Sequence, residues 1–105
     1  MRRIFDKLAA IARACGPVRI YPQKTRVVIQ ARIRFAGGRP MRTQFVAGFL
    51  LPPGTTSPRF SDVLDNVSRH YIAAYVPLQS EAAVDAEISR WMKRAYRFGC
   101  QEHLR

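Results

Sequence analysis

Residues 25–51 alternate apolar and polar side chains with a period of two, and the alternation is interrupted once, at residues 36–40. This period is typical of β-strands that bury one face. Because the interruption contains two glycines and a proline, the pattern predicts a long β-hairpin that turns there. Pairing Phe35 with Met41 keeps both apolar sets on one face, and a slip of one residue would expose one of them.

The two faces of this predicted hairpin differ sharply in chemistry. The inner face would carry Val27, Ile29, Ala31, Ile33, Phe35, Met41, Phe45, Ala47, Phe49 and Leu51. The outer face and the turn would carry the candidate anion-binding or nucleic-acid-binding residues Arg26, Arg32, Arg34, Arg39 and Arg42. Arg34 would lie opposite Arg42, where a bound anion relieves the repulsion. Because the phenylalanines point inward, the pattern favours contacts to phosphates over base stacking.

The charge of the whole chain agrees with that face. Lysine and arginine number 18 against 7 acidic residues, and the formal net charge is +11. Such an excess attracts polyanions and acidic partners. Two interpretations stay open at this point: the charge serves binding, or it serves only solubility and reflects codon composition.

The rest of the chain supplies two amphipathic helices and three shorter strands. The predicted elements are a helix over 3–15, a strand over 18–22, the hairpin, a loop over 52–58, strands over 60–64 and 70–76, and a helix over 80–98 capped by Ser80. Helical spacing within 60–76 leaves a helix there as an alternative. The predicted fold class is α+β, a single domain over 1–105. It is a two-layer sandwich in the order α-β-β-β-β-β-α, with an antiparallel sheet and both helices on one face.

No motif for catalysis, metal or cofactor binding is found. The only histidines are His70 and His103, and the only cysteines are Cys15 and Cys100, which give no complete metal-ligand set. We therefore expect no enzyme, no catalytic residue, no metal and no cofactor. Because the sequence has no signal-peptide pattern and no membrane-spanning apolar run, we expect a cytoplasmic protein without membrane contact. The uncovered sheet face also suggests a homodimer.

Two hypotheses for function follow. The first is a non-enzymatic binding or accessory domain that contacts an acidic protein or a nucleic-acid backbone through its basic face. The alternative is a small-molecule binding domain with a pocket between helices and sheet, lined by Trp91, Tyr71 and Tyr75.

The second half of the chain resembles a bacterial family known only as domain of unknown function 5655. The resemblance lies in the passage 75–80 and in helix residues Val84, Asp85, Glu87, Ile88, Trp91, Ala95 and Tyr96. It implies a small α+β sandwich, often appended to predicted transport-type proteins, and it implies no activity. The family tends to carry histidine on its last strand, where this chain has Ala73 and Ala74.

Overall fold

The computed structural model describes residues 2–104. Its elements, in chain order, are α1 (Arg2–Cys15), β1 (Arg19–Gln23), β2 (Arg26–Gln30), β3 (Arg34–Pro40), β4 (Phe45–Leu51), β5 (Asp62–Leu64), β6 (Ile72–Leu78), the 3-10 helix η1 (Glu81–Ala83), α2 (Ala86–Gly99) and the 3-10 helix η2 (Glu102–Leu104). In this described range, neither α-helix is long and apolar enough to cross a membrane.

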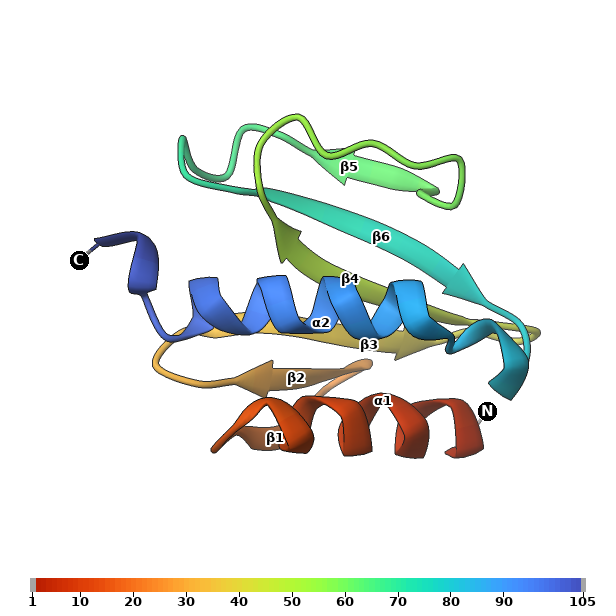
Figure 1. The fold of residues 1–105 in the computed structure, drawn as a ribbon. Coiled ribbons are helices and arrows are strands. Elements are labelled where there is room, and N and C mark those ends of the chain that lie inside the picture. Colours follow the sequence, from red (N-terminus) through yellow and green to blue (C-terminus); the bar gives the residue numbers. More distant parts are fainter. Residues whose placement is uncertain (1, 105) are drawn as a thin grey trace.

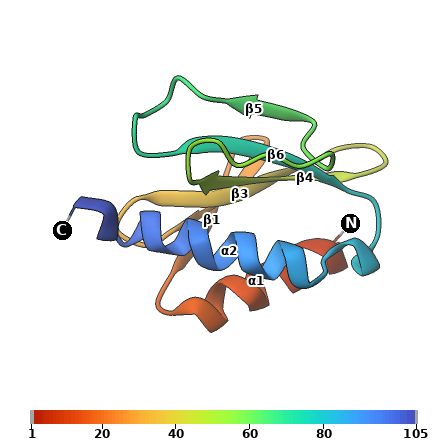
Figure 2. The same cartoon turned by 45° about the horizontal axis from the view of Figure 1, so that its top comes forward.

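The strands form one antiparallel sheet in the order β1-β2-β3-β4-β6-β5. Both α-helices lie on the same face of this sheet, so within residues 2–104 the opposite face has no α-helix over it (Figure 1 and Figure 2). The predicted fold class is therefore confirmed, and β5 and β6 confirm the two predicted strands near residues 60–76. The sheet has six strands where five were predicted, because the long first strand of the hairpin divides into β2 and β3.

The hydrophobic core lies between the helices and the sheet. From the sheet it takes Ile29, Phe35, Phe45, Ala47, Phe49, Leu51, Ile72, Ala74, Val76 and Leu78, and from the helices Ile4, Leu8, Ala12, Ile88, Trp91, Met92 and Ala95. The alternation along β4 and β6 is strict, with every second residue buried. The inner face predicted for β4 is thus confirmed.

The predicted register of the hairpin is wrong. The chain turns at residues 31–33 and again at 41–44, while residues 36–40 belong to β3. Phe35 therefore does not pair with Met41. Ala36 instead pairs with Ile29 on β2 and with Phe49 on β4.

The predicted register is wrong because the position of the turn depends on a contact with α2, which is distant in the sequence. The backbone N–H groups of Arg32 and Ile33 both donate to the carbonyl oxygen of Gly99 at the end of α2, at 2.9 and 3.0 Å. These two bonds hold the tight turn at residues 31–33. The glycines at 37 and 38 serve close packing: a Cβ on Gly37 would lie 2.4 Å from the Val27 carbonyl oxygen, and one on Gly38 would lie 2.1 Å from the Phe45 ring.

A β-bulge then restores the alternation of faces. Between β2 and β3 the register shifts, so that Gln30 opposes Arg34 while Ile29 opposes Ala36. Phe35 is the extra residue, and the bulge lets its side chain stay in the core, 1% exposed. The outward position of Arg34 and the inward position of Phe35 are therefore kept although the pairing differs from the predicted one.

The second α-helix also begins later than predicted. Ser80 precedes η1 and makes no capping hydrogen bond with its side chain. The N-cap of α2 is Asp85, whose carboxylate accepts a hydrogen bond from the Ile88 N–H. Sequence pattern missed this because both residues are good N-caps and both precede acidic residues.

Phe45 is expected to be a principal contributor to stability, because it is 2% exposed and its ring lies 6.1 Å from that of Phe5 on α1. Replacing it with alanine should lower the free energy of unfolding by about 3–5 kcal/mol. Met41→Ala is the control, since Met41 is 44% exposed and should change stability by less than about 0.5 kcal/mol. Equal urea midpoints for the two variants would refute the described core.

Candidate functional site

The face of the sheet opposite the helices carries one row of cross-strand neighbours that runs through all six strands. In order from β1 to β5 the row is Tyr21, Val28, Gly37, Gly48, Tyr75 and Asp62. Side chains of directly paired residues point to the same face. The row therefore places two adjacent glycines at its centre, with Tyr21 and Tyr75 on either side of them.

These glycines produce a groove. A cavity of 530 Å³ lies on this face, and we call it the open-face groove. Gly37 and Gly48 line it together with Val28, Val46 and Leu50. Glycine in the interior of a strand weakens the sheet and is typical of places where another group approaches the backbone closely.

Three of the predicted arginines, Arg26, Arg34 and Arg39, line this groove. Arg26 and Arg39 lie one residue beyond the Val27–Gly38 pair on neighbouring strands, so two positive charges are adjacent there. Within residues 2–104 the ion pairs involve only Arg3 and Arg59, and none of the three groove arginines has a carboxylate partner.

The other two predicted arginines lie elsewhere. Arg32 is in the β2–β3 turn and Arg42 in the β3–β4 turn, and both are exposed. The expected cross-strand pair of Arg34 with Arg42 does not form, because the hairpin turns at other residues and Arg34 opposes Gln30. The five arginines thus separate into three that line the groove, of which Arg26 and Arg39 are neighbours, and one in each turn of the hairpins.

Two aromatic residues lie on this face, contrary to the expectation that it has none. The Tyr21 hydroxyl donates to Gln30 Oε1 at 2.8 Å and accepts from Arg34 Nε at 3.2 Å, and the Arg19 guanidinium lies 5.6 Å from the Tyr21 ring centroid. Tyr75 lines the groove beside Gly48. The alternation along β1 and β6 separates Tyr21 and Tyr75 from the apolar residues of their strands, but only the strand pairing shows that they share a face with the groove arginines.

Trp91, Tyr71 and Tyr75, predicted to share a pocket, are not brought together. Trp91 is 7% exposed in the core, with the rings of Phe49 and Phe60 at 6.3 and 5.1 Å. Tyr75 points away from the core, because it alternates with the buried residues of β6. Tyr71 lies near the C-terminal end of α2, its ring 5.3 Å from that of Phe98.

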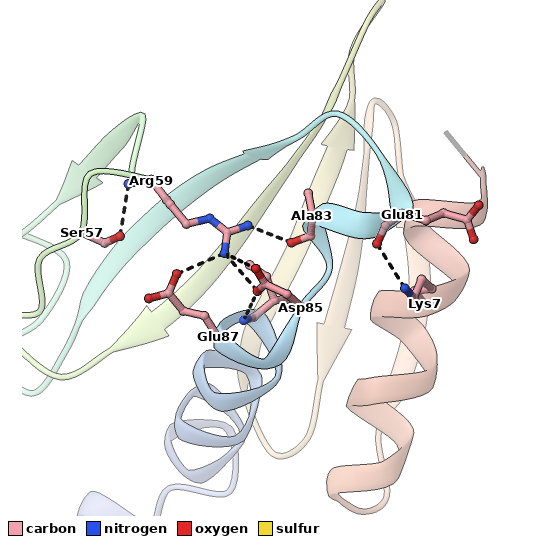
Figure 3. Close-up of polar contacts among 8 residues, drawn as sticks. Lys7, Ser57, Arg59, Glu81, Ala83, Asp85 and Glu87 are labelled. Carbon is pink, nitrogen blue, oxygen red and sulfur yellow. Dashed lines mark hydrogen bonds and ion pairs between the residues drawn. The ribbon is translucent and has the colours of Figure 1, made fainter.

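The far wall of the groove is formed by the segment that leads into β5, and Arg59 fastens this segment to α2. One Arg59 nitrogen, Nη1, lies 3.0 and 3.1 Å from the two Asp85 carboxylate oxygens and 3.1 Å from Glu87, while Nη2 donates to the Ala83 carbonyl oxygen at 2.8 Å (Figure 3). The Arg59 guanidinium also lies 5.8 Å from the Trp91 ring centroid. This cluster is a structural anchor, because each polar group already has a partner within it.

Among residues 2–104, the remaining titratable groups form no second site of comparable definition. Burial raises the pKa of the Cys15 thiol, although Lys93 acts in the opposite direction, so the thiol stays protonated near neutral pH. In the part of the chain that the structure describes, no three histidine, cysteine, aspartate or glutamate residues are grouped to hold a metal ion. The rings of His70 and of His103 in η2 have centroids 5.0 Å apart and are tilted by 54° to each other.

Comparison with known proteins gives a family and no characterised relative. A family model described as "Domain of unknown function (DUF5655)" matches residues 1–99. No curated protein and no solved structure matches the chain. The match includes every strand of the open-face groove.

The anchor predicts a pH dependence of stability. Partial desolvation acts to raise the pKa of Asp85, but the hydrogen bonds from Arg59 and Ile88 outweigh it and hold the pKa below its ordinary value of 3.8. The contribution of ionised Asp85 to the free energy of unfolding is therefore complete above the unfolded-state pKa of this carboxyl, and it is lost as pH falls through the lower folded-state pKa. The Asp85→Asn variant can still cap α2. Between pH 5 and pH 2 its free energy of unfolding should fall less than that of the wild type. The difference should be at most about 1 kcal/mol, because the Arg59–Asp85 pair is partly exposed. Identical acid-denaturation curves would contradict the anchor.

Proposed function

The chain belongs to the DUF5655 family of domains of unknown function, and from this starting point we propose that it is a non-enzymatic binding domain whose open-face groove contacts nucleic-acid phosphates. The observation that carries the proposal is that Arg26, Arg34 and Arg39 all line one groove and lack carboxylate partners within residues 2–104. Arginine guanidinium groups bind phosphate through short, charge-assisted and often bidentate hydrogen bonds.

The arrangement of these arginines favours an anionic ligand over an empty surface. Arg26 and Arg39 stand on adjacent strands, where like charges destabilise the pair. A chain with a net charge of +11 gains nothing further in solubility from crowding them together. Arg34 also donates from its Nε to the Tyr21 hydroxyl, so its terminal N–H groups are the donors it can offer to a phosphate.

The groove is better suited to binding than to catalysis. Its lining has one carboxylate, Asp62, and one serine, Ser61, and neither cysteine nor histidine among the described residues. Asp62 accepts a hydrogen bond from the Val63 N–H, and Ser61 bonds the Tyr75 carbonyl oxygen. No nucleophile with an adjacent base results from these contacts.

Binding to DNA should depend on the groove arginines and on salt. Three neutralised phosphates predict a log–log slope of about −2.7 with duplex DNA, so affinity should fall about 40-fold between 50 and 200 mM salt. The double variant Arg26→Glu/Arg39→Glu should abolish binding, because it reverses the charge of the groove. Fluorescence anisotropy of labelled mixed-sequence DNA across this salt range measures both effects.

The matched control carries the same change in net charge at a distance from the groove. Arg13→Glu/Arg90→Glu replaces exposed residues on α1 and α2, on the helix side of the sheet. It should retain most of the affinity. Equal losses in the two double variants would show that only overall charge matters, and tighter binding of polyglutamate than of DNA would indicate an acidic protein as the partner.

A further inference from the structure

We infer that the open-face groove binds single-stranded nucleic acid, with one unpaired base stacked on Tyr75 and the adjacent phosphates on the arginines. This inference rests on the proposed function and specifies which form of nucleic acid the groove binds. It starts from an asymmetry of the groove: the cationic residues are on β2 and β3, while the aromatic ring is on β6.

The Tyr75 ring is placed as a platform by the glycine opposite it. A Cβ built on Gly48 would lie 3.1 and 3.3 Å from ring atoms Cε1 and Cδ1 of Tyr75, so the ring leans over the Gly48 backbone. An aromatic ring that covers a cross-strand glycine is held against the sheet and presents its other face outward. Base stacking on such a ring occurs with any base, because every base has a π-face.

Tyr21 does not offer an equivalent platform. Arg19 already lies over its ring, and its hydroxyl is engaged by Gln30 and Arg34. Tyr21 therefore orients Arg34, and Tyr75 is the aromatic ring left to receive a base. Asp62 stands beside Tyr75 on the far wall and repels phosphate there, which keeps the phosphates at the arginine side.

A duplex cannot make the stacking contact with Tyr75, although its phosphates can reach the arginines. The groove extends from β2 to β5, four strand spacings of about 4.8 Å or roughly 19 Å of sheet. A volume of 530 Å³ accommodates a ligand of drug-like size, such as one nucleotide. In a duplex the faces of the bases are stacked within the helix, so Tyr75 could reach only the backbone.

The span between the two ends fits a short strand. Tyr75 on β6 and Arg39 on β3 are two strand spacings apart across the sheet and two residues apart along the strands, so their backbones lie about 12 Å from each other. This equals about three to four nucleotides at the duplex rise of 3.4 Å and fewer in an unstacked strand. One base at Tyr75 can thus be followed by phosphates at Arg39 and Arg26 without a break in the chain.

The test compares three labelled probes of equal length, about ten nucleotides, at one salt concentration: a single-stranded oligothymidylate, an abasic strand with the same phosphates, and a mixed-sequence duplex. An RNA strand of equal length shows which sugar is preferred. We expect the oligothymidylate to bind more tightly than the other two DNA probes. Tyr75→Ser should weaken binding of the oligothymidylate about 5- to 150-fold and leave the abasic strand and duplex unchanged, and Tyr75→Phe should restore it.

The outcomes separate this inference from the function on which it rests. Equal affinity for the abasic strand and the oligothymidylate, or no response to Tyr75→Ser, would overturn the stacking and leave phosphate binding in place. Absence of binding by all probes at low salt would overturn both. Tyr71→Ser is the matched control, because Tyr71 packs against Phe98 away from the groove, and it should leave the preference unchanged.

Discussion

Two hydrogen bonds to one carbonyl oxygen determine where the central strands of this domain begin and end. Arg32 and Ile33 donate to Gly99, and this contact places the end of α2 against the turn between β2 and β3. A Cβ on Gly99 would lie 2.4 Å from the Phe35 ring, so the helix can approach the turn only with glycine at this position. Once the turn is fixed there, Gly37 must lie within β3 and opposite Gly48, and the groove on the far face follows.

The faces of the strands could be predicted from sequence, whereas their partners could not. Alternation with a period of two assigns Ile29 and Phe45 to the core whichever strand lies next to them, and both are buried. The choice of partner depends on which break in the pattern is a turn. Gly37 and Gly38 resemble turn residues locally, and the contact that overrides them involves Gly99, more than sixty residues later. Because of the bulge at Phe35, the side chains of Arg34 and Phe35 still point to the faces of the sheet that the sequence predicts, although their strand partners differ.

The same distinction applies to the candidate site. The arginines were identified from sequence because charge accumulates visibly along one polar face, and three of them converge at the groove. Tyr75 was instead assigned to a pocket with Trp91, because an aromatic residue on a predicted strand gives no indication of its side of the sheet without neighbours. The groove in this charged surface lies where Gly37 pairs with Gly48, and this pairing could not be predicted because the predicted register of β3 was wrong.

The two edge strands of the sheet, β1 and β5, affect how copies of the protein can associate at high concentration. β1 contains Pro22, which has no N–H to offer an incoming strand, and β5 extends over only three residues. Neither edge is a suitable template for the addition of strands from a neighbouring molecule, and the net charge of +11 opposes such pairing. We therefore expect any contact between copies to use the open face of the sheet and not to extend the sheet into a fibre.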